Sequence, residues 1–470
     1  MNKKMICFSV VVAVLLSIFP IGSLFAYESL IGPTGVVQYD KTKAYNGYTL
    51  FSSNTEGCTT AYLIDMEGYV VHEWKTQYAA GLHDVLLENG NLLRGADLTL
   101  SPGGNLKVMK QPYKIGGGHA GLLQEFDWNG NLVWEYELNT PTAVSHHTFT
   151  RHPTNGNTLI LGWEYKSYDE AVAKGRNPAT VSKERGLWPD FIIEVNRAKQ
   201  VVWEYHVWDH IGTGPDQFDI NFIVPGMNNV ATQTQDWTHW NTANYHPTED
   251  KIIANSRHFG ESYVIDKKTG KLLYRFGNPS AYGAGKAPSF MQDGDQQLFG
   301  PHHAHVIPPG LPGAGHLLIL DNGWNRPMGN RTRTIEVDMS KGDTKDAIVW
   351  QYFSRTPNSL YSASQCANQR LPNGNTFITS TQPGHLIEVT PKREVVWEFI
   401  NPITSQKVGD VTTYPVVNCV YKDATPNTIH RSTRYGVGYP GLKGKDLSRK
   451  YPLAMGCPDF WKLYNGFMGK

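Results

Sequence analysis

The chain has 470 residues, of which 43 are Lys or Arg and 42 are Asp or Glu, so its formal net charge is +1 at pH 7. No basic run accompanies this balance, which argues against a nucleic acid as partner. Aromatic residues make up 12% of the chain, and it contains 46 glycines and 28 prolines. Since no long helical period follows residue 26, this composition favours an aromatic-rich β protein with many turns.

The first 26 residues are typical of a secretory signal peptide. Lys3 and Lys4 form a basic start, residues 6–21 are apolar, and Leu24-Phe25-Ala26 offers a small residue for cleavage. Because the apolar run is short for a membrane span, we expect cleavage, export to the periplasm or the extracellular space, and no stable membrane anchor afterwards. Cleavage would leave 43 − 2 = 41 basic against 42 acidic residues.

Short strands joined by tight turns follow in the mature chain. Residues 60–65 predict a strand, and residues 69–74 predict its hairpin partner. Residues 83–87 predict a third strand. Residues 92–93 begin a fourth after an Asn-Gly turn, because Asn-Gly tolerates the positive φ angles of hairpin turns. We expect these four antiparallel strands to form one blade of a repeat.

One element recurs six times: an apolar run that ends in a Trp-Glu step or a variant of it. Its aromatic residues are Trp74, Trp134, Trp203, Tyr274, Trp350 and Trp397. A repeat of this kind favours a β-propeller, in which a closed ring of blades hides the sheet edges. We therefore predict an all-β protein, a six-bladed β-propeller of four-stranded antiparallel blades with long inter-strand loops, as a single domain over residues 27–470.

Three segments lie outside this repeat. Residues 164–190 and residues 276–300 are polar and loop-like, and loops on a rigid scaffold often cover a functional site. The C-terminal stretch 408–470 has no unit of its own, so we expect it to supply closing strands or to wrap around the propeller.

Four cysteines follow residue 26: Cys58, Cys366, Cys419 and Cys457. An even number in an exported chain permits two disulfides. We favour a pair between Cys419 and Cys457, because both lie in the C-terminal segment. No Cys-x-x-Cys spacing is present, which argues against zinc or redox use of the thiols.

Histidines recur at one position of the repeat, shortly before the second strand pair. They are His83, His147, His239 and His303, and three more stand beside them, namely His146, His302 and His305. The innermost strand of a propeller blade lines the central channel, so we expect these imidazoles to converge there. Imidazole can act as nucleophile, as general acid or base, or as metal ligand. Independent structural histidines need not recur at one register, so the group indicates a functional site.

Three further polar residues lie near this register. Asn241 could orient a ligand or hold a turn in place. Arg257 and Arg326 follow predicted channel strands, where either could hold an anion through a bidentate contact. A surface ion pair is the alternative interpretation of each arginine.

The order and spacing of several motifs are similar to those of a known family. They include Asp236-Trp237-Thr238-His239-Trp240-Asn241, His302-His303-Ala304, Leu320-Asp321-Asn322-Gly323 and the tail Arg434-Tyr435-Gly436-Val437-Gly438-Tyr439-Pro440-Gly441-Leu442. In these motifs the chain resembles the bacterial arylsulfotransferase family of six-bladed propellers over most of its mature length.

This resemblance implies an exported enzyme that moves a sulfuryl group from a phenolic sulfate ester to another phenol without a nucleotide donor such as PAPS. The family uses a histidine nucleophile, further channel histidines and an arginine that holds the sulfate oxygens. By motif, His239 and either His302 or His303 match channel histidines, and Arg326 is the best match to the arginine. The sixth channel position reads Ser364-Gln365-Cys366, so this chain departs from the family if the nucleophile belongs there.

These arguments together give one set of expected site residues. The expected catalytic residues are His239, His303, His302, Arg326 and His147. The expected substrate-binding residues are Asn241, Arg257, His83 and His305. The substrate would be a small molecule, aromatic or anionic, and sulfuryl transfer itself requires no cofactor.

Two other functions remain open at this point, as does the oligomeric state. The chain could be a metalloenzyme, because convergent imidazoles without thiolates suit copper, zinc or iron. Its metal ligands would then come from His83, His147, His239, His303 and His305. The chain could also be a binding propeller without chemistry, although a channel rich in titratable groups fits such a role poorly.

Overall fold

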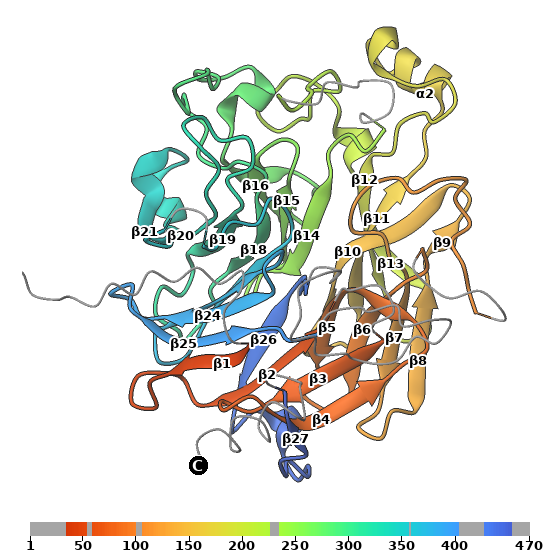
Figure 1. The fold of residues 1–470 in the computed structure, drawn as a ribbon. Coiled ribbons are helices and arrows are strands. Elements are labelled where there is room, and N and C mark those ends of the chain that lie inside the picture. Colours follow the sequence, from red (N-terminus) through yellow and green to blue (C-terminus); the bar gives the residue numbers. More distant parts are fainter. Residues whose placement is uncertain are drawn as a thin grey trace, which may run out of the picture. The chain divides into compact units, whose positions relative to one another are not determined.

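The computed structural model describes residues 34–53, 59–99, 106–225, 235–356, 359–403 and 427–453. Its strands form six antiparallel sheets of four or five strands each, arranged as the blades of a β-propeller (Figure 1). The predicted all-β, six-bladed fold is therefore confirmed. The expected signal peptide and the cysteines Cys58, Cys419 and Cys457 lie outside the described residues. No described helix is long and apolar enough to span a membrane.

Blades 1 and 6 each combine distant parts of the chain. Blade 1 contains, from the channel outward, β26 (Ser432–Gly436), β2 (Gly47–Ser52), β3 (Thr60–Ile64), β4 (Tyr69–Lys75) and β27 (Tyr451–Pro452). Blade 6 contains β22 (Ala367–Arg370), β23 (Thr376–Ser380), β24 (His385–Val389), β25 (Val395–Ile400) and β1 (Gly35–Tyr39). Figure 1 shows β26, in blue, beside β2, in red-orange. The C-terminal segment thus supplies the expected closing strand.

The other four blades are each continuous in sequence. Blade 2 contains β5 (Ala79–Leu86), β6 (Leu92–Asp97), β7 (Gly121–Phe126) and β8 (Leu132–Glu137). Blade 3 contains β10 (Ala143–Arg151), β11 (Thr158–Glu164), β12 (Asp190–Val195) and β13 (Val201–His206), with β9 (Asn139–Thr140) paired to β10. Blade 4 contains β14 (Trp240–Tyr245), β15 (Lys251–Ser256), β16 (Glu261–Asp266) and β17 (Leu272–Phe276). Blade 5 contains β18 (His302–Val306), β19 (Leu317–Asp321), β20 (Arg333–Val337) and β21 (Ile348–Tyr352).

Helical turns occur only in the connections between the described strands. The one α-helix among the described residues is α2 (Tyr168–Ala173), inside the segment 164–190 that we expected to be loop-like. Ser167 caps it and forms a capping box with Glu170. The 3₁₀ turns are η1 (Pro178–Thr180), η2 (Val207–His210), η3 (Pro279–Tyr282), η4 (Met339–Lys341), η5 (Lys345–Ala347) and η6 (Pro440–Leu442).

The predicted first blade is divided between two blades in the structure. Residues 60–65 and 69–74 lie in blade 1, whereas residues 83–87 and 92–93 open blade 2. The Trp-Glu strand is the fourth strand from the channel in each blade, and only blades 1 and 6 add a further strand, β27 or β1, outside it. From this strand the chain passes to the innermost strand of the next blade. The unit that repeats in the sequence therefore contains the third and fourth strands of one blade and the first two strands of the next.

The recurring aromatic residue links neighbouring blades. Trp74 of blade 1 donates its indole N–H to the carbonyl of Asp127 in blade 2 at 3.0 Å, and Trp134 of blade 2 donates to Arg197 in blade 3 at 3.1 Å. The same side-chain-to-carbonyl bond recurs in the other four blades, from Trp203 to Lys267, Tyr274 to Gly342, Trp350 to Pro391 and Trp397 to Met66. One aromatic side chain per blade thus ties the ring together, which explains why the residue repeats.

Apolar cores fill the spaces between adjacent blades. Leu161 and Ile192 of blade 3, for example, pack in one cluster with Trp240 and Ile252 of blade 4. The innermost strands contact one another in ring order, from β26 through β5, β10, β14, β18 and β22 back to β26. This ring of inner strands holds the histidines that the sequence singles out.

Candidate active site

A repeated backbone bend sets the direction of the channel histidines. His147, His239 and His303 have φ angles of 53°, 46° and 46°, in the left-handed region that non-glycine residues seldom adopt. The strand pairing shifts register across His147 in β10 and His303 in β18, and just after His239 in β14. Such bulges re-aim side chains and are common beside functional sites. The recurrence of histidine in the sequence therefore coincides with a recurring bulge in the structure.

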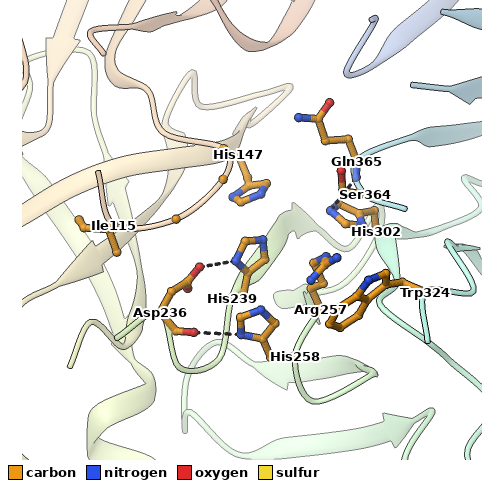
Figure 2. A pocket seen from close by; sticks show the side chains of 13 residues that line it. Ile115, His147, Asp236, His239, Arg257, His258, His302, Trp324, Ser364 and Gln365 are labelled. Atoms are coloured by element: carbon orange, nitrogen blue, oxygen red, sulfur yellow. Dashed lines mark hydrogen bonds and ion pairs between the residues drawn. The ribbon is translucent and has the colours of Figure 1, made fainter. Parts of the chain in front are cut away.

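A cavity of about 420 Å³ lies at the start of these inner strands. Three of its histidines come from successive blades, His147, His239 and His302, and one nitrogen of each lies within 4.8 Å of the others. Figure 2 shows their rings around one space, with Arg257 and Trp324 on the opposite side from Ile115. The cavity also contains Gly116, Gly117, Gly118, Asp236, His258, Ser364 and Gln365. The expected convergence of imidazoles is thus found for these three rings.

His239 is oriented by a buried carboxylate. Its Nδ1 lies 2.5 Å from Oδ2 of Asp236, whose Oδ1 accepts a hydrogen bond from the Trp163 indole at 3.1 Å. With Nδ1 committed to Asp236, Nε2 is the nitrogen left to face the cavity (Figure 2). Burial holds the pKa of His239 well below its ordinary value of 6.5. The ring is therefore neutral at physiological pH and carries a lone pair at Nε2.

His258 and Arg257 form the cationic and basic wall beside this pair. Nδ1 of His258 donates to the carbonyl of Asp236 at 2.9 Å, and burial lowers the pKa of His258 to about 3. The Arg257 guanidinium lies 4.2 Å from the centre of the Trp324 ring and donates to the carbonyl of Ala363 at 3.2 Å. Burial lowers the pKa of Arg257 only to about 10, so the side chain remains a cation at neutral pH.

His302 uses both of its ring nitrogens within the protein. Nδ1 lies 2.7 Å from Oδ1 of Asn322, and Nε2 accepts the backbone N–H of Gln365 at 3.0 Å. The Asn322 amide is held in turn by its hydrogen bonds to the carbonyls of Ser362 and Gln365. This ring is therefore fixed as a neutral imidazole that links blades 5 and 6.

His147 stands at the end of a buried chain of polar groups. Its Nδ1 lies 2.8 Å from Nδ1 of His146, and Nε2 of His146 lies 3.0 Å from Oδ1 of Asp190. The other oxygen of Asp190 accepts hydrogen bonds from the Thr238 hydroxyl and the Trp240 amide. Burial raises the pKa of Asp190 well above its usual range and lowers the pKa of His146 to about 3. Nε2 of His146 and Oδ1 of Asp190 are thus close together, although they are not aligned as a hydrogen bond in the described structure.

Three consecutive glycines close the cavity on the side of blade 2. A Cβ atom on Gly116 would lie 2.2 Å from the Asp236 carboxylate, and one on Gly118 would lie 2.2 Å from the His147 ring. Gly118 also has a φ angle of +89°. Gly117, between them, faces open space. The loop can therefore approach His147 and Asp236 closely only because it lacks side chains.

The other predicted histidines line a different cavity. His83, His303 and His305 surround a space of about 820 Å³ that shares no lining residue with the first. The prediction that His83 and His303 converge with His147 and His239 is therefore wrong. The bulge at His303 turns this side chain toward the second cavity, so that its neighbour His302 takes the place in the first.

Two predicted polar residues line neither cavity. Asn241 donates to the carbonyl of Pro301 at 2.8 Å and accepts from the Asn255 amide at 2.9 Å, which ties β14 to the start of blade 5. Arg326 forms ion pairs with Asp293 and Asp321 and stacks on Phe299. Its charge is thus already balanced, whereas Arg257 reaches the cavity.

Several lining residues were not predicted. The Gly116-Gly117-Gly118 run and Asp236, three residues before His239, are visible in the sequence as signals. His258 and Trp324 carry no such signal, because their place in the cavity depends on how blades 4 and 5 meet. Ser364 and Gln365 lie at the sixth channel position that the sequence indicated. Cys366 is buried beside the site, and burial raises the pKa of its thiol.

Comparison with solved structures finds proteins of low similarity. A protein of unknown function from Bacteroides caccae has a TM-score of 0.43 at 12% identity and covers 75% of this chain and 94% of that one. Apo AztD from Citrobacter koseri has a TM-score of 0.37 at 8% identity, covering 76% and 95%. Virginiamycin B lyase from Staphylococcus aureus has a TM-score of 0.37 at 12% identity, covering 79% and 85%. At these TM-scores the similarities carry no argument about function.

The comparison with protein families identifies the family of this chain, which the comparisons with single proteins do not. No curated protein matches the chain. Residues 34–431 match the family model described as arylsulfotransferase (ASST), which spans well over half of the chain. The match covers all three blades that carry His147, His239 and His302. By this match and by its six-bladed propeller, the chain belongs to the arylsulfotransferase family.

Proposed function

We propose that this chain transfers a sulfuryl group from a phenolic sulfate ester to a phenol, with His239 as the nucleophile. The observation that supports this choice is the Asp236–His239 pair, whose Nε2 faces a cavity that also holds a guanidinium. Sulfonation of Nε2 makes the imidazole cationic, and the Asp236 carboxylate stabilises that charge. This assignment supplies a nucleophile although the sixth channel position has no histidine.

The first half-reaction cleaves the donor ester. The lone pair on Nε2 of His239 forms a bond to sulfur as the bond between sulfur and the phenolic oxygen breaks. The departing oxygen takes a proton from Nε2 of His147, and protons shift along His146 so that Asp190 becomes a carboxylate. In the second half-reaction the acceptor phenol returns a proton to His147 and attacks sulfur, which restores neutral His239 and protonated Asp190. The two half-reactions balance without another reactant.

Arg257 is the residue we assign to the sulfate oxygens. Its guanidinium is a cation at neutral pH, lines the same cavity as His239 and has no carboxylate within ion-pair distance in the described structure. A fixed cation at the transferring group stabilises the transition state without reorganisation. Trp324, on which Arg257 stacks, keeps the guanidinium in place.

The test is nitrophenol release from 4-nitrophenyl sulfate by the mature protein, with and without added phenol, after chelation. We expect release that increases with phenol. His239→Asn should lower it by at least about 10³-fold, as expected for loss of a nucleophile. Arg257→Gln should lower it by roughly 10²-fold, in the range of a lost electrostatic contact.

The matched control is His206→Gln, which removes a histidine that pairs with Glu164 outside both cavities. It should keep full turnover. Mass spectrometry of protein quenched with donor alone should find a sulfuryl adduct on the peptide that contains His239. Full turnover by His239→Asn, or an adduct on another histidine, would disprove this assignment.

A metal site is the second candidate for the same cavity, because His147, His239 and His302 offer nitrogens within 4.8 Å of one another. Against it, both nitrogens of His302 already have partners in Asn322 and Gln365. A metal would have to break one of these bonds. Stoichiometric copper, zinc or iron in the purified protein, with turnover lost on chelation, would support the metal site over sulfuryl transfer by His239.

A further inference from the structure

The second cavity lies toward the opposite end of the inner strands from the proposed sulfuryl-transfer site. In β10, His147 belongs to the first cavity and Arg151, four residues later, to the second. In β18, the adjacent residues His302 and His303 face different cavities. The second cavity has a volume of about 820 Å³ and no role in the reaction proposed above.

Arg431 is a buried cation in this cavity without a carboxylate partner. The side chain is 5% exposed, and its hydrogen bonds run to Nδ1 of His83 and to the Thr148 hydroxyl, both at 3.2 Å. Among the described residues its Nε has no hydrogen-bond partner and no acidic group forms an ion pair with it. Burial lowers the pKa of Arg431 to about 9, so it remains charged at neutral pH. A buried charge of this kind is costly unless an opposite charge joins it.

The imidazoles around Arg431 add donors and no negative charge. Nδ1 of His303 accepts the backbone N–H of Asn368 at 3.1 Å, so Nε2 of His303 carries the hydrogen and can donate. The His83 ring stacks on Phe149, with 4.7 Å between ring centres. Burial keeps the pKa of both histidines well below 6.5, so both are neutral.

The rim of the cavity is cationic as well. The charged residues that line it are four arginines, Arg151, Arg197, Arg370 and Arg431, and two glutamates, Glu88 and Glu125. Arg151 and Arg197 share Glu125, and Arg370 pairs with Glu336. The remaining lining carboxylate, Glu88, is exposed and forms no ion pair with Arg431 in the described structure. The walls also include apolar side chains such as Val306 and Leu311.

We propose that the second cavity is an oxyanion-binding site in which Arg431 holds a sulfate, either free or as the sulfate or sulfonate group of an organic molecule. Arg431 and Nε2–H of His303 would donate to the oxygens, and the apolar wall would accept an organic group. The proposal rests on Arg431 and holds whether or not the first cavity transfers sulfuryl groups.

The experiment is isothermal titration of sodium sulfate into two variants of the mature protein at low, constant ionic strength. Arg257→Gln removes the guanidinium of the first cavity and leaves the second intact. Arg257→Gln/Arg431→Gln lacks both. We expect sulfate to bind the single variant and to bind the double variant at least ten-fold more weakly. Equal sulfate affinity in the two variants, or no binding to either, would overturn the proposal.

A second probe and a second variant make the test independent of one substitution. If an organic anion is the ligand, benzenesulfonate should bind Arg257→Gln more tightly than sulfate does. If the free ion is the ligand, benzenesulfonate should bind no more tightly than sulfate. In either case the binding should depend on Arg431. If Arg431→Gln does not fold, His303→Leu in the Arg257→Gln background removes the second donor. It should weaken sulfate binding several-fold, and unchanged binding would contradict the site.

Discussion

At the scale of single residues, His146 is the group whose role is least visible in the sequence. Its ring stacks on Trp163, with 3.7 Å between ring centres and 14° between the planes. Its two nitrogens contact His147 and Asp190. In the proposed reaction, a proton that enters Nε2 of His147 passes through His146 to Asp190, so that no charged imidazolium is left beside the sulfonated His239. His146 is a positioning residue in this scheme, since it acts through His147.

His146→Phe tests this role, because phenylalanine keeps the stack on Trp163 and removes both nitrogens. Aryl sulfates with basic leaving groups need the proton from His147 and should be cleaved about 10²-fold more slowly. 4-Nitrophenyl sulfate, whose phenolate leaves readily, should be affected only a few-fold. Rates are to be compared across a series of donors of rising phenol pKa. A uniform loss over the series would indicate a purely structural role and contradict the relay.

The sequence predicted the histidines better than their partners. The recurrence of His147 and His239 at one register is sufficient to place both in the channel. It cannot tell His302 from His303, because a bulge between them decides which ring faces which cavity. Arg326 matched the family motif, yet its two carboxylate partners come from Asp293 and Asp321, and only the fold shows that they meet. Ion pairing across loops is a tertiary property that spacing does not encode.

At the scale of elements, the loop before β7 shapes the site because its three glycines have no side chains. A Cβ on Gly118 would overlap the His147 ring, and the positive φ of this residue would strain any other side chain. Gly117 has nothing within 4 Å of its Cβ position. Because Gly117 itself lines the cavity, the matched control for Gly118 is Gly438, which is exposed, lies outside both cavities and also has nothing within 4 Å of its Cβ position.

Gly118→Ala should displace His147 or the loop and lower turnover of 4-nitrophenyl sulfate at least ten-fold, since small misplacements of catalytic groups are costly. Gly438→Ala, at an exposed position outside both cavities, should leave turnover within about two-fold of the unsubstituted protein, because its methyl group meets only open space. Steady-state kinetics of both variants, with circular dichroism to confirm folding, provide the comparison. Similar turnover in the two would show that the loop does not position His147.

The sequence predicted the individual strands more accurately than their assignment to blades. The strands at 60–65, 69–74 and 83–87 are present close to where the hydrophobic pattern places them. Their division between blades 1 and 2 was missed, because alternation and turn signals describe neighbours along the chain and not the edge at which a sheet ends. The repeated Trp was the available clue, since its bond to the next blade marks the outer strand.

At the scale of the whole molecule, the ring is closed by two independent seams. β26 enters blade 1 at the channel, and β1 enters blade 6 at the outer edge. The Trp397 indole then joins blade 6 to blade 1 at 2.9 Å, in the same way as the other blades are joined. Closure at both the inner and the outer edge fixes the inner strands, and with them the channel, on which the spacing of His147, His239 and His302 depends.

The channel makes the stability of the whole molecule sensitive to acid. Thirteen histidines have pKa values lowered chiefly by burial, namely His72, His83, His119, His146, His147, His210, His239, His246, His258, His302, His303, His305 and His430. They ionise near pH 6.5 in the unfolded chain and, for His146 and His258, near 3 in the fold. Below pH 6.5 the unfolded state therefore binds more protons than the folded state does. Asp190 and Asp236, whose pKa values are raised, act in the opposite direction but are fewer.

We accordingly expect the free energy of unfolding to be fully present above pH 6.5 and to fall steadily as the pH decreases from 6.5 toward 3. Each histidine contributes up to about 1.4 kcal/mol per pH unit in this window. Urea midpoints measured between pH 7.5 and 5 would record the fall. His119→Phe should make the free energy of unfolding less dependent on pH, by the contribution of up to one proton. Burial lowers the pKa of His119 to about 3, and the residue has no part in the proposed reaction. A midpoint that does not change over this range would show that the channel admits protons and counterions without opening the ring.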